Sequence, residues 1–202
     1  MTLWPMTRVQ ADDVIASAAL QYSDHVERIV ICSSDQDFCQ CLNDKISLWN
    51  RSRRTVQTAE DVRPRYGVQP ARFAEYLALV GDGSDGLPGV PEFVQKTTAA
   101  LLNRYPNVEA IITATGEWSG DIRGVSSMVP MLLERRDEAI LYRDLSILRT
   151  DVPLHHHMDD LRWRELNRSL LLTLTQLIED VSVLPRLNRW QRLDEPFAVS
   201  GG

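Results

Sequence analysis

Three pairs of aspartates are the residues of this sequence whose types and spacing best suit chemistry. They are Asp12 and Asp13, Asp35 and Asp37, and Asp82 and Asp85. Hard cations such as Mg²⁺ prefer oxygen ligands, and a site for two ions needs carboxylates that converge from different segments. Such ions can activate water and stabilise the leaving oxygen of a phosphodiester. Taken singly, however, an aspartate pair is more typical of a helix cap or a turn.

The first two pairs lie on predicted elements of an α/β fold. Residues 11–22 have apolar positions at helical spacing and carry the first pair in the first turn, where the helix dipole favours acids. Residues 28–32 are apolar and β-branched, which predicts a buried strand. The second pair follows in a loop before a short predicted helix at 38–42. This order is typical of a sheet that binds ligands at the carboxyl end of its strands.

The rest of the chain is predicted to be mostly helical. Residues 45–58 indicate one or two strands joined by a basic turn, and residues 81–89, rich in glycine and aspartate, predict a loop that carries the third pair. We expect helices at 59–66, 70–80, 95–105, 108–113 and 166–180, and two more within 121–148 that are interrupted near 136–137. We therefore expect an α/β part at 1–58, a helical part at 59–182 and a loose tail at 183–202.

Composition limits the class of protein. The chain has 202 residues, of which 44% are hydrophobic, and no apolar run approaches the ~20 residues that span a bilayer. Three cysteines and no visible secretory signal favour a cytosolic protein with reduced thiols. The formal net charge of −6 argues against a nucleic-acid partner. The six paired aspartates equal that whole charge, so the argument weakens if they bind cations.

The order of the three pairs resembles the bacterial 5′→3′ exonuclease and flap endonuclease family, which includes the 5′-nuclease domain of bacterial DNA polymerases. Residues 10–16, Gln-Ala-Asp-Asp-Val-Ile-Ala, are similar to its Glu-Ala-Asp-Asp segment. Residues 34–40, Ser-Asp-Gln-Asp-Phe-Cys-Gln, are similar to its Asp-Lys-Asp-Leu-x-Gln loop. Residues 76–91, Tyr-Leu-Ala-Leu-Val-Gly-Asp-Gly-Ser-Asp-Gly-Leu-Pro-Gly-Val-Pro, resemble its longest and most specific run. The similarity extends from about Trp4 to Arg162.

The resemblance implies a fold and a metal site. The fold is the C-terminal part of a PIN-like nuclease core, followed by a helical domain with a helix–three-turn–helix DNA-binding motif. The site holds two magnesium or manganese ions. Asp12, Asp13 and Asp35 would support the more tightly held ion. The second ion would be supported, partly through water, by Asp37, Asp82 and Asp85.

The resemblance also implies contacts with DNA. The phosphates of duplex DNA would be gripped through backbone N–H groups, a bound potassium ion and a lysine, at Gly89, Val90, Pro91, Lys96 and Thr97. The substrate would be DNA with free 5′ ends or flaps, the context would be replication or repair, and a DNA polymerase is a further expected partner. A membrane partner is not expected.

Three departures from the family pattern leave an alternative open. The family's nuclease core begins well before the first residue here, so we expect an N-terminally truncated core with an exposed apolar sheet edge. Gln10 stands where the family has glutamate. Glu92, Phe93 and Val94 stand where it has Gly-x-Gly. The alternative to a nuclease is therefore a weak or inactive DNA-binding remnant, or a chain that needs a separate N-terminal partner.

Several other features have plainer interpretations. The three consecutive histidines at 155–157 predict a surface loop, because neighbouring residues do not converge easily on one ion. Single tryptophans are more typical of packing than of base stacking. The basic triplet Arg51, Arg53 and Arg54 fits a DNA backbone contact and a solvated turn equally well. An aspartyl-phosphate phosphotransferase built on Asp35 and Asp37 would leave the run at 76–91 unexplained.

Overall fold

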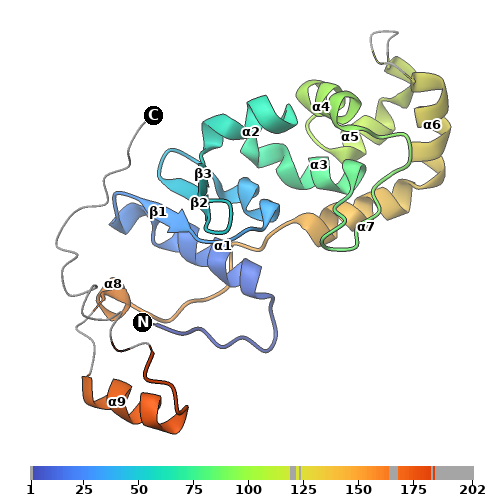
Figure 1. Cartoon of the computed structure of the whole chain (residues 1–202). Coiled ribbons are helices and arrows are strands. Elements are labelled where there is room, and N and C mark those ends of the chain that lie inside the picture. The colour runs from blue at the N-terminus through green and yellow to red at the C-terminus, as the bar shows by residue number, and fades with distance from the viewer. Residues whose placement is uncertain (1, 119–121, 123, 164–167, 183, 185–202) are drawn as a thin grey trace. The chain divides into compact units, whose positions relative to one another are not determined.

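The structure is a computed structural model that describes residues 2–118, 122, 124–163, 168–182 and 184 (Figure 1). The chain divides into a large unit, Thr2–Asp160, and a small unit formed by Leu161–Gly202 with Met1. The small unit contains α9 (Arg168–Leu177), which agrees with the helix predicted at 166–180. Of the predicted tail at 183–202, all residues except 184 lie outside the described part. The candidate site lies wholly in the large unit.

The first part of the large unit contains a three-stranded sheet. Its order is β1 (Ile29–Ile31), β2 (Ile46–Asn50) and β3 (Thr55–Gln57). β1 runs parallel to β2, and β2 and β3 are antiparallel, which confirms the two strands and the turn predicted at 45–58. The prediction that the first strand is buried is wrong, because Val30 is 46% exposed. β1 is an edge strand, and Ile31 is the residue of β1 that is fully buried.

Two elements flank the strands and carry the first two acidic pairs. Helix α1 (Ala11–Gln21) buries Val14, Ala16 and Ala19. The segment after β1 forms a 3-10 helix, η2 (Gln36–Cys41), where a short helix was expected. Phe38 and Cys39 are fully buried in η2, so the turn that carries the second acidic pair is fixed to the core.

The second half of the large unit is helical, as predicted. It contains α2 (Ala59–Tyr66), α3 (Phe73–Val80), α4 (Gln95–Arg104), α5 (Val108–Thr113), α6 (Val125–Glu134) and α7 (Arg136–Ser146), with short 3-10 turns η3 (Pro70–Arg72) and η4 (Thr115–Glu117). A further 3-10 turn, η1 (Ser23–His25), follows α1, and helix α8 (Met158–Leu161) lies where the division between the two units falls. The break expected near 136–137 falls at Arg135, which ends α6 and precedes α7. None of the helices among the described residues is long and apolar enough to cross a membrane.

Helix α3 is the centre of this helical part, and Figure 1 shows it beside α7 and below α4. Seven of its eight residues are buried, since its sequence is apolar at nearly every position. Glu75 is the one charged residue among the buried residues of α3. Its carboxylate accepts a hydrogen bond from the Val108 N–H at 2.9 Å and lies 3.7 Å from Arg143, so a buried charge is both paired and used to cap α5.

The remaining predictions on single residues are mostly confirmed. Cys39 and Cys41 are buried and free, and His155 and His157 are exposed. Trp118 is buried against Phe93, whereas Trp163 is 63% exposed, so the packing expectation is wrong for that tryptophan. Trp163 lies in the small unit, where Leu170, Leu172 and Leu177 are also exposed.

The loop after α3 depends on a close approach between two backbone segments. Gly89 has a φ of +68°, and a Cβ atom at this position would lie 2.5 Å from the Gly81 nitrogen and 2.6 Å from the Val80 carbonyl carbon. Gly83, in the same loop, has nothing within 4 Å of such an atom. The loop that carries Asp82 and Asp85 is therefore closed at its base and open at its tip.

We predict that Gly89→Ala destabilises the chain and that Gly83→Ala does not. A left-handed φ costs a residue with a side chain about 1–2 kcal/mol, and the backbone clash at Gly89 adds to this. Thermal unfolding followed by circular dichroism should show a lower midpoint for Gly89→Ala alone. Equal midpoints for the two variants would contradict the close approach.

Candidate metal centre

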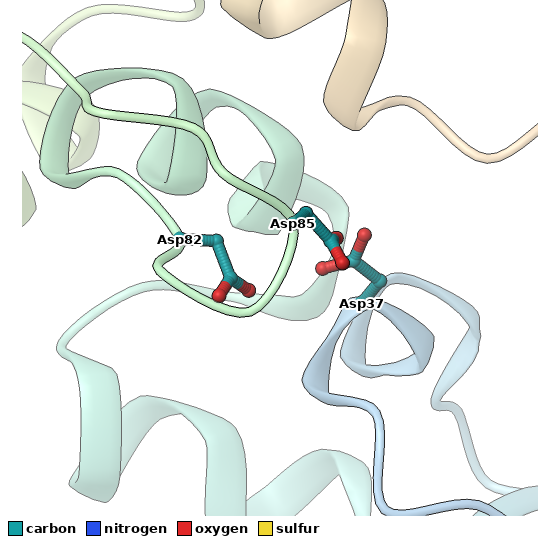
Figure 2. A group of neighbouring side chains, drawn as sticks. All are labelled: Asp37, Asp82 and Asp85. Atoms are coloured by element: carbon teal, nitrogen blue, oxygen red, sulfur yellow. The ribbon is translucent and has the colours of Figure 1, made fainter.

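Three carboxylates from two distant segments converge in the large unit. Asp37 comes from η2, and Asp82 and Asp85 come from the loop after α3. One oxygen of each lies within 4.8 Å of the others, and Figure 2 shows the Asp37 and Asp85 carboxylates facing one another. Among the described residues, this is the group of acids, cysteines and histidines with the spacing of a metal site. We call these three residues the carboxylate nest.

Asp37 is the most perturbed member of the nest. Its side chain is buried, and its Oδ1 atom has no hydrogen-bond partner. Burial raises the pKa of Asp37 to about 8, helped by the negative charges of Asp35, Asp85 and Asp82. Asp35 also holds the backbone in place, because its Oδ1 atom accepts the Asp37 N–H at 2.9 Å as the cap of η2. A proton or a cation would relieve the repulsion.

Asp82 is held as a carboxylate by hydrogen bonds. Its Oδ1 atom accepts from the N–H and the hydroxyl of Ser84, and its Oδ2 atom accepts from Nε2 of Gln36 at 2.7 Å. Burial would raise the pKa of Asp82, but these hydrogen bonds outweigh it and leave the pKa below its usual value. Paired backbone hydrogen bonds between Asp82 and Leu87 close the loop, and Asp85 is exposed at its tip.

The first acidic pair divides between two environments. Burial raises the pKa of Asp12, and the charges of Asp35, Asp85 and Asp13 raise it further, so Asp12 lies in the field of the nest. The Oδ1 atom of Asp13 accepts the N–H of Arg149 at 2.9 Å, which ties α1 to the segment after α7. Asp12, Asp13 and Asp35 are outside the 4.8 Å group, and their role as ligands stays a prediction.

Gln36 is a site residue that the sequence analysis did not single out. It stands where the similar family has lysine, and it bridges two parts of the site. Its amide nitrogen binds Asp82, and its amide oxygen lies 3.5 Å from the Tyr66 hydroxyl. The signal available in the sequence was its position between Asp35 and Asp37 at the start of a helical turn. That position places it beside the acidic pair, but its bond to Asp82 follows from the meeting of η2 and the loop after α3.

The predicted DNA-binding hairpin is an exposed turn that leads into α4. Pro91 and Lys96 are exposed and Thr97 is half-buried. Val90 is buried, and its N–H donates to the Leu79 carbonyl at 2.8 Å. Glu92 has a φ of +74°, the left-handed region that favours glycine, at a position where the similar family has glycine.

Family models cover most of the chain. Residues 1–67 match the model described as "5′-3′ exonuclease, N-terminal resolvase-like domain". Residues 68–169 match "5′-3′ exonuclease, C-terminal SAM fold". The chain belongs to the 5′-3′ exonuclease family. The α/β part with a helical domain after it, expected from the resemblance, is thereby confirmed.

Curated relatives agree with this assignment. The chain is 30% identical over 154 residues to the 5′-3′ exonuclease of Buchnera aphidicola subsp. Acyrthosiphon pisum, covering 76% of this chain and 54% of the relative. It is 30% identical over 154 residues to the flap endonuclease Xni of Aeromonas hydrophila, covering 76% and 56%. It is 31% identical over 184 residues to DNA polymerase I of Caldicellulosiruptor bescii, covering 88% and 21%. The chain thus spans about half the length of its free-standing relatives.

Solved structures share the fold. The bacteriophage T5 flap endonuclease, solved with DNA and metal ions, matches with a TM-score of 0.62 and 21% identity, covering 72% of this chain and 52% of that one. The T5 5′-exonuclease with bound zinc matches with a TM-score of 0.61 and 21% identity, again covering 72% and 52%. At this identity the likeness shows the fold alone.

We predict that the metal-free chain loses stability as the pH rises toward 8. The folded Asp37 carboxyl, with a pKa of about 8, holds its proton more tightly than the unfolded chain, whose value is near 3.8. The folded state therefore binds more protons between these values, and the free energy of unfolding falls across that range as pH rises. Urea unfolding in EDTA at about pH 6 and about pH 8.5 measures the difference.

The matched variant for this prediction is Asp37→Asn, which removes the titrating group and keeps the shape of the side chain. The difference in unfolding free energy between the two pH values should shrink in this variant. A difference as large as that of the unchanged chain would mean that other groups cause it.

Proposed function

We propose that this chain supplies the carboxylate centre of a metal-dependent 5′→3′ exonuclease or flap endonuclease, which hydrolyses DNA phosphodiester bonds near free 5′ ends. One observation carries the proposal. Asp37, Asp82 and Asp85 bring three oxygens within 4.8 Å of one another, and the Oδ1 atom of Asp37 is buried without a partner. Because the chain belongs to the 5′-3′ exonuclease family, the chemistry expected of this cluster is metal-dependent hydrolysis of phosphodiester bonds.

The residues present fit a hard divalent cation, Mg²⁺ or Mn²⁺. Carboxylate oxygens are the ligands these ions prefer, and histidine and cysteine are absent from the group. A bound ion would neutralise the repulsion at Asp37 and supply positive charge beside a phosphodiester. Asp82 is pre-oriented for this role by Ser84 and Gln36. A second ion would draw on Asp12, Asp13 and Asp35, and potassium would bind at the hairpin.

The proposed substrate is DNA, in replication or repair in the cytosol. The T5 flap endonuclease was solved with DNA and metal ions, and relatives of this chain include DNA polymerase I. The hairpin at Gly89–Pro91 and the start of α4, with Lys96 and Thr97, would bind phosphates of the duplex. A DNA polymerase would act on the same DNA ends.

The test is cleavage of a labelled duplex with a 5′ flap in Mg²⁺. We expect cleavage that is lost on removal of the metal, and at least a hundredfold loss of rate in Asp37→Asn, since an ion and its ligand act in the rate-limiting chemistry. Asp24→Asn is the matched control, because this side chain is 94% exposed and does not belong to the nest. Calorimetry with Mg²⁺ should show weaker binding in Asp37→Asn only.

Two observations favour a second candidate, a DNA-binding chain with weak or no activity. Gln10, at the start of α1, brings no negative charge where the similar family has glutamate. Glu92 places a carboxylate on the exposed turn where a phosphate would lie. Binding of the flap duplex without Mg²⁺-dependent cleavage would support this candidate over the nuclease.

We predict that the double variant Glu92→Gly and Val94→Gly binds duplex DNA more tightly. It removes a negative charge, releases the strain of a left-handed glutamate and uncovers the start of α4, where Val94 is 60% exposed. We expect roughly a tenfold gain in affinity at fixed salt, measured by fluorescence anisotropy. An unchanged affinity would count against the hairpin as a DNA-binding element.

A further inference from the structure

The turn between β2 and β3 and the end of α2 carry five arginines within a short stretch of chain. All five are exposed, and none takes part in the ion pairs found among the described residues. They are Arg51, Arg53, Arg54, Arg63 and Arg65, and we call them the arginine strip. The same stretch contains two exposed acids, Glu60 and Asp61, so the five arginines leave a local excess of positive charge in a chain whose formal net charge is −6.

One end of the arginine strip lies beside the carboxylate nest. The Arg65 guanidinium is 5.1 Å from the centre of the Tyr66 ring, and the charge of Arg53 also acts on the Tyr66 hydroxyl. That hydroxyl is 3.5 Å from the Gln36 amide oxygen, and the Gln36 amide nitrogen binds Asp82. Arg65 and Asp37 both act electrostatically on the thiol of Cys39. Two side chains, Tyr66 and Gln36, thus connect Arg65 to Asp82 of the nest.

The strip also adjoins the start of α4. The Gln95 side chain donates a hydrogen bond to the Arg65 carbonyl at 2.5 Å. Gly67, at the end of α2, packs so closely on α4 that an added Cβ atom would lie 2.6 Å from the Cβ of Ala99. Lys96 follows Gln95 in the exposed first turn of α4. Two exposed cations, Lys96 and Arg65, therefore lie on adjoining segments of α4 and α2.

The chemistry of these side chains suits phosphate. Arginine binds phosphate oxygens through two parallel N–H groups and stays charged at every relevant pH. Arg51 lies 5.9 Å from the centre of the Trp49 ring, which orients its guanidinium without neutralising it. A carboxylate nest would repel DNA, so a strand that reaches it needs cations close by. The strip supplies them on the side of the nest where Gln36 and Tyr66 lie.

We propose that the arginine strip binds successive phosphates of the DNA strand between the hairpin and the carboxylate nest. The inference rests on the proposed function and adds a binding track for its substrate. Arg65 is the central contact, because its guanidinium lies 5.1 Å from the centre of the Tyr66 ring and its carbonyl accepts the Gln95 side chain. Arg53 represents the β2–β3 turn, where its N–H donates to Oδ1 of Asn50. The contacts are to the backbone, so they position the strand without reading its sequence.

The test is the binding of a fluorescein-labelled duplex with a 5′ flap, in EDTA so that no cleavage occurs, over a series of salt concentrations. In the double variant Arg53→Gln and Arg65→Gln we expect roughly a tenfold weaker affinity at moderate salt. We also expect the slope of log affinity against log salt to shrink by about two, one for each phosphate contact. Circular dichroism melting checks that the variant is folded.

The matched control is Arg28→Gln with Arg136→Gln, which removes the same charge from two exposed arginines outside the strip. Arg28 precedes β1, and Arg136 begins α7. The control should keep the salt slope of the unchanged chain. An equal loss in both double variants would show only a general effect of charge, and an unchanged slope in the strip variant, or no measurable binding by the unchanged chain, would overturn the proposal.

The binding and cleavage experiments together distinguish failure of the arginine-strip proposal from failure of the proposed nuclease function. If Asp37→Asn abolishes cleavage while the strip variant binds like the unchanged chain, the nuclease stands and the strip is wrong. If binding depends on the two arginines and no variant cleaves in Mg²⁺, the strip stands and the nuclease is wrong.

Discussion

The constraint on which the rest of the structure depends is the repulsion among carboxylates held together in a partly buried place. Two unit charges about 4 Å apart repel by roughly 4 kcal/mol where the effective dielectric constant is about 20. The pKa of Asp37 is raised, which favours its neutral form and lowers the repulsion. The negative charge of Asp82 is instead stabilised by hydrogen bonds from Ser84 and Gln36. A fold that only needed stability would place apolar residues here. The free-energy cost of this repulsion is explained if a bound cation takes the place of the proton on Asp37.

The surrounding elements keep the carboxylates from moving apart. Buried Phe38 and Cys39 fix η2, and the core helix α3 delivers the loop of Asp82. The base of that loop is closed by the close approach of Gly81 and Gly89 and by the paired backbone hydrogen bonds between Asp82 and Leu87. Gln36 joins the two segments directly. Asp37 and Asp82 are therefore buried against the packed core, whereas Asp85 is exposed to solvent.

The sequence predicted the elements and the motifs better than the side-chain partners. Helical spacing located α1, α4 and α5 almost to the residue, and the glycine and aspartate run located the loop. Local patterns carry that information. The local pattern at 28–32 favoured a buried strand, whereas β1 is an edge strand with Val30 exposed, since burial of a strand depends on which strands flank it.

Hydrogen bonds between residues distant in the chain could not be predicted from the sequence, because they depend on which segments meet in the folded structure. Asp13 binds the N–H of Arg149, and its position beside Asp12 gives no hint of that use. Gln36 reaches Asp82 only because η2 and the loop after α3 meet in space. The sequence likewise contained no sign that Arg65 of α2 lies over the Tyr66 ring, whose hydroxyl reaches Gln36 beside the nest.

The most direct test of the central claim is where manganese binds. Backbone amide signals in two-dimensional NMR can be followed as small amounts of Mn²⁺ are added to the ¹⁵N-labelled chain. We expect the signals of Asp37, Ser84 and Asp85 to broaden first and together, since these segments meet at the nest. Broadening that begins at another acidic stretch, such as Asp159 and Asp160, while these signals stay sharp would contradict the metal centre.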